Sequence, residues 1–119
     1  MTQQDKELLL KDLCARLPYG VKVEIKSYDN EEKPWFGELS CKDLDCFLHD
    51  VVYTSIRPYL RPRESMTAEE EREFQKIKYS YHFDEHSYIL FDWLKAHHFD
   101  YRELIEKGLA IEAPEGMYN

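Results

Sequence analysis

The sequence predicts an α+β fold in which an N-terminal helix, a small antiparallel sheet and C-terminal helices packed on that sheet share one core. Apolar residues first recur with helical spacing, then alternate with charged residues as in half-buried strands, and finally return to helical spacing. The chain has 119 residues, of which 43% are hydrophobic and 14% aromatic. That supply suffices for one sizeable core and is too small for two independent domains. We therefore expect a single domain over residues 1–119.

The first predicted helix covers residues 5–17. Pro18 and Gly20 directly after it are typical of a helix end. On this interpretation Asp12 and Arg16 lie on the face that contacts water. The apolar face consists of Leu9, Leu10, Leu13, Cys14 and Leu17.

A sheet region is predicted over residues 21–57. It opens with Val21, Val23 and Ile25, which alternate with charged residues as in a strand with one buried face. Three to five antiparallel strands fit either an open sheet or a small open barrel. Pro58 and Pro62 place the following segment at a sheet edge or outside the sheet. The further predicted segments are a polar turn over 28–34 and strands over 35–42, 44–48 and 51–57.

The region from 67 to 108 is predicted to be helical. Thr67 and Glu70 have the spacing of a capping box, in which the threonine side chain and the glutamate side chain each bind the other's backbone N–H. The remaining predicted segments are a helix over 84–98, a short helix over 100–107 that ends at Gly108, a short strand over 109–111 and a loose tail over 114–119.

Charge argues against nucleic acid as a partner. The chain carries 16 Lys and Arg against 24 Asp and Glu, a formal net charge of -8. Such an excess of carboxylates repels phosphate backbones. The acidity favours solubility, and the alternative is an acidic inhibitor or nucleic-acid mimic whose carboxylates line one face.

The chain is expected to be cytoplasmic. Its three cysteines, Cys14, Cys41 and Cys46, form no disulfide-like framework. The polar N-terminus differs from a signal peptide, and no apolar run is long enough to span a membrane. We therefore expect no membrane partner.

Three strings in the chain resemble a group of short bacterial proteins to which no activity is assigned. The strings contain P-Y-L-R-P and W-L-x-x-H-H-F-D-Y-R-x-L-I-x-x-G-L-A, and they lie at Leu8–Ile25, Ile56–Thr67 and Asp92–Pro114. The resemblance implies a cytoplasmic bacterial protein and points to a mobile element as its origin. It implies no reaction, and the other segments resemble nothing.

One string matches a metal motif. His82, Glu85 and His86 have the H-x-x-E-H spacing of inverted zinc peptidases, in which two histidines bind zinc and the glutamate activates water. Few residues follow from which such an active site could be built, and the local sequence fits a strand or loop as well as a helix. We therefore prefer an exposed or capping role, and a small metal-dependent hydrolase is the alternative.

A second cluster contains Cys41, Cys46 and His49. Its spacing is looser than that of structural zinc sites, and strand alternation favours buried free cysteines. No Gly-rich phosphate loop is present. We therefore expect neither a resident metal nor a cofactor.

The candidate binding residues fall into two groups. Arg57, Tyr59, Arg61 and Arg63 form a basic strip that could meet a carboxylate or phosphate, or could pair with Glu64 and the Glu69–Glu73 run of the same chain. Trp93, His97 and His98 at a helix end form either a polar pocket edge or a corner that satisfies free backbone groups.

These observations contain no catalytic constellation. The sequence predicts a non-catalytic binding or adaptor module whose partner is a protein or a small anionic ligand.

Overall fold

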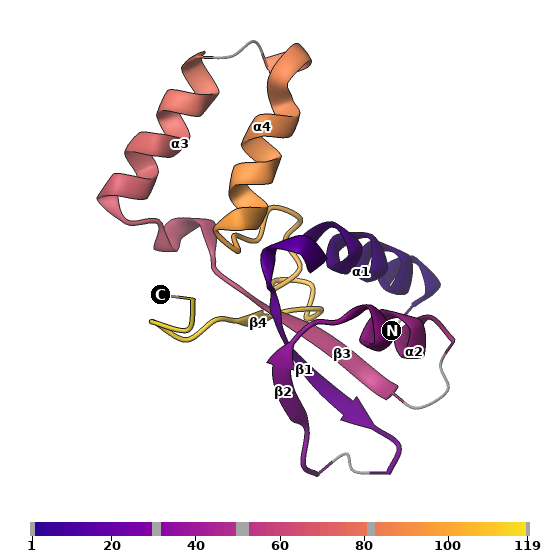
Figure 1. The fold of residues 1–119 in the computed structure, drawn as a ribbon. Helices are drawn as coiled ribbons and strands as arrows, with labels where there is room; N and C mark the ends of the chain where they lie inside the picture. The colour runs from indigo at the N-terminus through magenta and orange to yellow at the C-terminus, as the bar shows by residue number, and fades with distance from the viewer. Residues whose placement is uncertain (1, 30–31, 50–52, 81–82, 119) are drawn as a thin grey trace.

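The computed structural model describes residues 2–29, 32–49, 53–80 and 83–118, and it confirms the predicted α+β class (Figure 1). Within these residues no helix is both long and apolar enough to cross a membrane. The elements are α1 (Gln3–Arg16), β1 (Lys22–Ser27), β2 (Trp35–Glu38), α2 (Cys41–Leu48), β3 (Tyr53–Leu60), α3 (Ala68–Ser80), α4 (Phe83–Ala96) and β4 (Ile111–Glu112), with 3-10 turns at Leu17–Tyr19 and Arg63–Ser65.

Helix α1 starts earlier than predicted because Thr2 caps it. The Asp5 N–H donates to the Thr2 hydroxyl over 3.0 Å, and the Thr2 N–H donates to the Asp5 carboxylate over 3.4 Å. This capping box satisfies two amides that the first helical turn leaves free. The helix ends at Arg16, and a 3-10 turn follows it as far as Gly20, whose φ of 73° is a left-handed conformation that glycine adopts without strain.

The prediction that Asp12 and Arg16 face water is wrong. Both side chains are fully buried, and Arg16 Nε donates to Asp12 Oδ2 over 2.7 Å. Arg16 Nη2 also donates to the Phe99 carbonyl over 2.7 Å, and Arg102 Nε reaches Asp12 Oδ1 at 3.1 Å. The hydrogen bonds that offset the desolvation of these charges include ones to a segment more than eighty residues away. Helical periodicity alone therefore did not reveal them.

The four strands form an open mixed sheet in the order β2-β1-β3-β4, and the sheet does not close into a barrel. The pairs β1–β2 and β1–β3 are antiparallel as predicted, whereas β3 and β4 are parallel. Val23 and Ile25 in β1 are buried as predicted, but Glu24 between them is also buried, where it pairs with Arg57 of β3.

Pro58 lies inside a central strand, contrary to the expected edge position. The Leu60 carbonyl accepts from Ala113 N–H, so the backbone N–H and C=O groups of Leu60 point to the side of β3 on which β4 lies. Every second residue of a strand points its backbone groups to the same side, so those of Pro58 point there too. Pairing with β4 begins only at Tyr59 and Ile111. The missing N–H of Pro58 therefore costs the sheet no hydrogen bond, and its ring is buried in the core.

The predicted strand over 44–48 is wrong, because these residues belong to helix α2. Ser40 and Asp43 form a capping box in which the Asp43 N–H donates to Ser40 Oγ over 3.3 Å and the Asp43 carboxylate accepts from the Ser40 N–H over 3.0 Å. Phe47 is buried and Leu48 is exposed, which is helical rather than alternating burial. The predicted strand over 35–42 consequently ends at Glu38.

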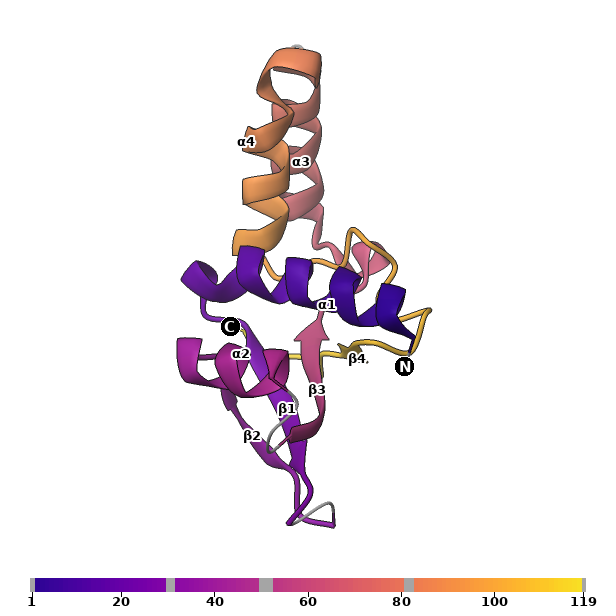
Figure 2. The ribbon, with the colours of Figure 1, turned by 90° about the vertical axis from the view of Figure 1, so that its right-hand side faces the viewer.

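Two apolar clusters divide the core. The first lies between the sheet and helices α1 and α2, which cover one sheet face (Figure 2). The second holds the hairpin of α3 and α4 together and consists of Phe74, Leu90, Leu94 and Phe99. The C-terminal helices, expected against the sheet, thus pack on each other and project from one end of the molecule (Figure 1).

The segment after α4 differs from prediction in two respects. Residues 100–107 form turns rather than a short helix, because the Asp100 carboxylate accepts from the backbone N–H groups of Arg102, Leu104 and Ile105. The chain beyond Pro114 is docked rather than loose. The Tyr118 hydroxyl donates to the Tyr59 carbonyl over 2.6 Å and accepts from Lys22 N–H over 2.9 Å.

The Tyr118 hydroxyl takes the position of a ladder bond. The register that pairs Val23 with Pro58 would make Lys22 and Tyr59 the next pair, and the hydroxyl bridges their backbone groups. The Lys22 ammonium also donates to the Met117 carbonyl over 2.9 Å. The C-terminal segment therefore completes the end of the β1–β3 pair.

The buried ion pair yields a first prediction. Asp12→Leu strands the Arg16 charge in the core, and we expect it to lower the free energy of unfolding by about 3–5 kcal/mol. The double variant Asp12→Leu/Arg16→Met removes both charges and should recover most of that loss. Denaturant unfolding of the three proteins measures both effects. A single variant that loses less than about 1 kcal/mol would contradict a buried, paired charge.

A second prediction concerns the hydroxyl at the sheet end. Tyr118→Phe leaves Lys22 N–H and the Tyr59 carbonyl without their partner, and should lower the free energy of unfolding by about 1–3 kcal/mol. Tyr79→Phe is the matched control, because that ring is 79% exposed and its hydroxyl stays in water. Equal unfolding curves for Tyr118→Phe and the parent would show that the segment is not anchored.

Candidate functional site

Each residue of the predicted basic strip contacts another side chain of the same chain. Arg57 pairs with Glu24 of the neighbouring strand at 2.8 Å. Tyr59 is 9% exposed, and burial together with the Glu24 charge raises its pKa above the ordinary value. Arg63 lies over the Phe74 ring at 4.7 Å. Each of these residues has a partner in its own chain, which favours the intramolecular alternative over an anion-binding strip.

Arg61 is held most firmly. Its two terminal nitrogens donate to the two Glu70 oxygens over 2.8 and 2.6 Å, and its guanidinium lies 4.2 Å from the centre of the Phe99 ring. Glu70 therefore has two roles, since its carboxylate also accepts from Thr67 N–H over 3.0 Å in the predicted capping box of α3. The Arg61 hydrogen bonds lower the pKa of Glu70 to about 2.

Trp93 and His97 join this cluster from α4. His97 Nδ1 lies 3.3 Å from Glu70 Oε2, and its ring centre is 4.3 Å from that of Trp93. The Trp93 indole N–H donates to Glu73 over 3.2 Å. The two residues thus meet Arg61 at the base of the hairpin, as structural partners of α3.

His98 lies apart from them. It adopts a φ of 64° and stacks on Tyr118 with ring centres 3.6 Å apart. Burial lowers its pKa to about 4, and the nearby Arg16 charge acts in the same direction. The imidazole is consequently neutral at pH 7 and serves as a flat apolar support for the C-terminal segment.

The metal hypotheses gain nothing from the structure. His82 lies outside the described residues, as do the side chains of Glu85 and His86. Across the part of the chain that is described, no group of three or more His, Cys, Asp and Glu side chains is placed to hold a metal.

The second cluster belongs to helix α2 and the residue that caps its C-terminus. The prediction that both cysteines are buried is wrong, because they lie on a helix and not on a strand. On α2, Cys41 is exposed and Cys46 is half-buried. His49 ends this helix and lies 3.3 Å from Asp45 on an exposed face.

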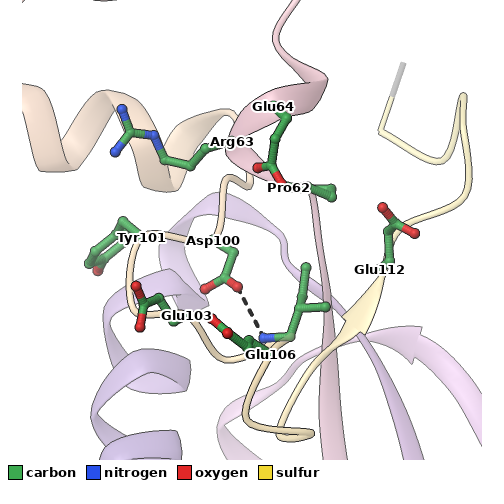
Figure 3. A pocket seen from close by; sticks show the side chains of 9 residues that line it. Pro62, Arg63, Glu64, Asp100, Tyr101, Glu103, Glu106 and Glu112 are labelled. Atoms are coloured by element: carbon green, nitrogen blue, oxygen red, sulfur yellow. Dashed lines mark hydrogen bonds between the residues drawn. The ribbon is translucent and has the colours of Figure 1, made fainter.

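An acidic hollow of about 650 Å³ lies between the Arg63–Ser65 turn, the segment after α4 and β4 (Figure 3). Asp100 at its centre is committed to the backbone N–H groups of the turn. Arg63 extends away from the carboxylates in the figure. The exposed carboxylates around the hollow, which repel phosphate and attract cationic side chains, are those of Glu64, Glu103, Glu106 and Glu112.

Sequence reasoning missed two residues that organise this region and identified a third only in part. Glu70 was predicted as a cap, and the Glu69–Glu73 run was an alternative partner of the basic strip, but the sequence did not single out the Arg61–Glu70 pair. Phe99 and Tyr118 carried no periodic signal at all, because each lies in irregular chain. Their roles arise from contacts between distant segments.

The low pKa of Glu70 generates a third prediction. In the unfolded chain this carboxyl protonates near 4.5, whereas in the folded protein it stays ionised down to about pH 2. Its contribution is therefore complete above pH 4.5 and is lost as the pH falls from 4.5 to 2, by about 3 kcal/mol in total. Glu70→Gln should be less stable than the parent at pH 6, and the two should converge near pH 2.

Denaturant unfolding between pH 2 and pH 6 measures this difference. Glu69→Gln is the control, because Glu69 is exposed in the same helical turn. A gap between Glu70→Gln and the parent that stays constant with pH would contradict the shifted pKa.

Comparison of the chain with protein-family models, with curated proteins and with solved structures finds no match. Its function therefore has to be inferred from its own geometry.

Proposed function

We propose that this chain is a non-catalytic protein-binding module that takes an extended segment of a partner protein as a further strand along β2. The free edge of the sheet carries this proposal. Strand addition supplies main-chain hydrogen bonds for affinity and neighbouring side chains for selectivity.

The backbone of β2 offers hydrogen bonds outward. The Leu39 N–H donates to the Val21 carbonyl, and Trp35 and Gly37 follow the same alternation toward β1. The N–H and C=O groups of Phe36 and Glu38 consequently face away from β1. Figure 2 shows β2 at the margin of the sheet, and among the described residues no strand pairs with its outer side.

Large aromatic side chains flank this edge on both faces. Trp35 is 51% exposed and Phe36 is 56% exposed. The Trp35 indole lies over Gly37, where a Cβ would come within 2.4 Å of a ring carbon, so the glycine makes room for the ring. An added strand would cover part of both rings, which are otherwise in contact with water.

Charge favours a different protein over a second copy of this chain. Each copy carries a net charge of -8, and Glu38 ends the strand with an exposed carboxylate. Pairing two such edges brings like charges together. A partner segment with alternating apolar residues and a basic residue opposite Glu38 complements the edge in shape and charge.

The test is hydrogen exchange of the full chain with a peptide selected against it from a display library. In the free protein the Phe36 and Glu38 amides should exchange fast while Trp35 and Gly37 are protected. The peptide should protect Phe36 and Glu38. Phe36→Pro removes only an outward N–H and should abolish peptide binding, whereas Phe36→Leu should retain it.

Two outcomes would overturn the proposal. The first is a selected peptide that binds Phe36→Pro as well as the parent or protects amides elsewhere. The second is a chain that sediments as a dimer with Phe36 already protected, which would assign the edge to a second copy.

A further inference from the structure

We propose that a second hollow, between α1 and the base of α4, binds a small aromatic phosphate. The hollow measures about 570 Å³, within the range of small-molecule sites, and its location is distinct from the β2 edge. It is lined by Lys11 of α1, by Tyr88, Phe91, Asp92 and Lys95 of α4, and by Tyr101 and Arg102 of the following turn. Figure 2 shows the C-terminal end of α4 next to α1.

The rings form the apolar part of the hollow. Phe91 and Tyr101 lie with ring centres 5.3 Å apart at 51°, and Phe91 remains 37% exposed. Tyr88 is 61% exposed beside them. A planar ligand ring would cover aromatic faces that otherwise contact water.

Cations outnumber carboxylates here, in contrast to the molecule as a whole. Three cations, Lys11, Lys95 and Arg102, face two carboxylates: Asp92 in the lining and Asp12, which is buried behind Arg102 and pairs with it. Asp92 neutralises Lys95 only loosely at 3.4 Å, and Lys11 is exposed. The hollow is therefore an electropositive site on an acidic protein.

Arg102 is held in place for an anion. Its Nε donates to buried Asp12 over 3.1 Å, and Nη2 lies 3.4 Å from the Tyr101 hydroxyl. Neither contact uses Nη1. A guanidinium fixed by a buried carboxylate loses little side-chain entropy when it binds a phosphate oxygen.

The ligand must satisfy both halves of the hollow. A phosphate alone leaves the rings in water, and an uncharged ring makes no use of the Lys11 and Arg102 charges. The matching chemistry is a ring joined to a phosphate, which a free mononucleotide and a phenyl phosphate share. A polyanionic nucleic acid strand is disfavoured because the net charge of the chain is -8.

Calorimetry and amide NMR on the full chain test this with four probes. Adenosine monophosphate and phenyl phosphate carry both features, adenosine carries only the ring, and inorganic phosphate carries only the charge. We expect the two aromatic phosphates to bind, with shifts at Lys11, Phe91 and Tyr101, and the other two probes to bind at least about tenfold more weakly. Adenosine monophosphate binding tighter than phenyl phosphate would assign the site to nucleotides, and the reverse order to phosphorylated phenols.

Variants separate the two halves. Lys11→Gln should weaken the aromatic phosphates about fivefold through the lost charge and leave adenosine unaffected. Phe91→Ala should weaken them comparably, while Lys107→Gln, at an exposed lysine outside the hollow, should change nothing. No saturable shift with any probe at about 5 mM, or equal binding by Lys11→Gln and Lys107→Gln, would overturn the proposal.

Discussion

The arrangement of this molecule depends on the buried pairing of Asp12 with Arg16. Arg16 fixes the Phe99 carbonyl, and Asp12 also holds Arg102. One helix thereby sets the course of the chain after α4. Such a pair contributes little net stability after desolvation, but every alternative packing leaves a charge unpaired. The pair therefore acts chiefly by giving one arrangement of α1 and the 99–102 segment a lower free energy than alternative arrangements.

Sequence patterns within a few residues correctly predicted those elements whose structure depends on neighbouring residues. The buried apolar positions of β1 and the Thr67–Glu70 capping box were correct because each is encoded within a few residues. Helix α2 was missed because the alternation of Leu44, Cys46 and Leu48 imitates a strand, while Ser40 just before it supplies a helix start. Where a capping signal and a short alternation disagree, the cap proved decisive here.

The candidate sites were less predictable than the fold. Arg57 and Arg61 are near neighbours in sequence, yet Glu24 from β1 and Glu70 from α3 draw them into separate ion pairs. The two hollows depend on turns around Asp100 that no periodicity describes. A sequence identifies charged residues, but which charges remain available to a ligand is decided by tertiary partners.

The division of the core into two clusters has a thermodynamic consequence. The α3–α4 hairpin has an apolar cluster of its own, and it joins the rest of the molecule partly through charged links, among them Arg16 to Phe99 and Arg61 to Glu70. Salt screens the partly exposed Arg61–Glu70 pair more than the fully buried Arg16, and it leaves apolar burial intact. The hairpin is thus a cooperative unit whose junction with the rest of the molecule includes one salt-sensitive link, and subglobal opening would begin at that junction.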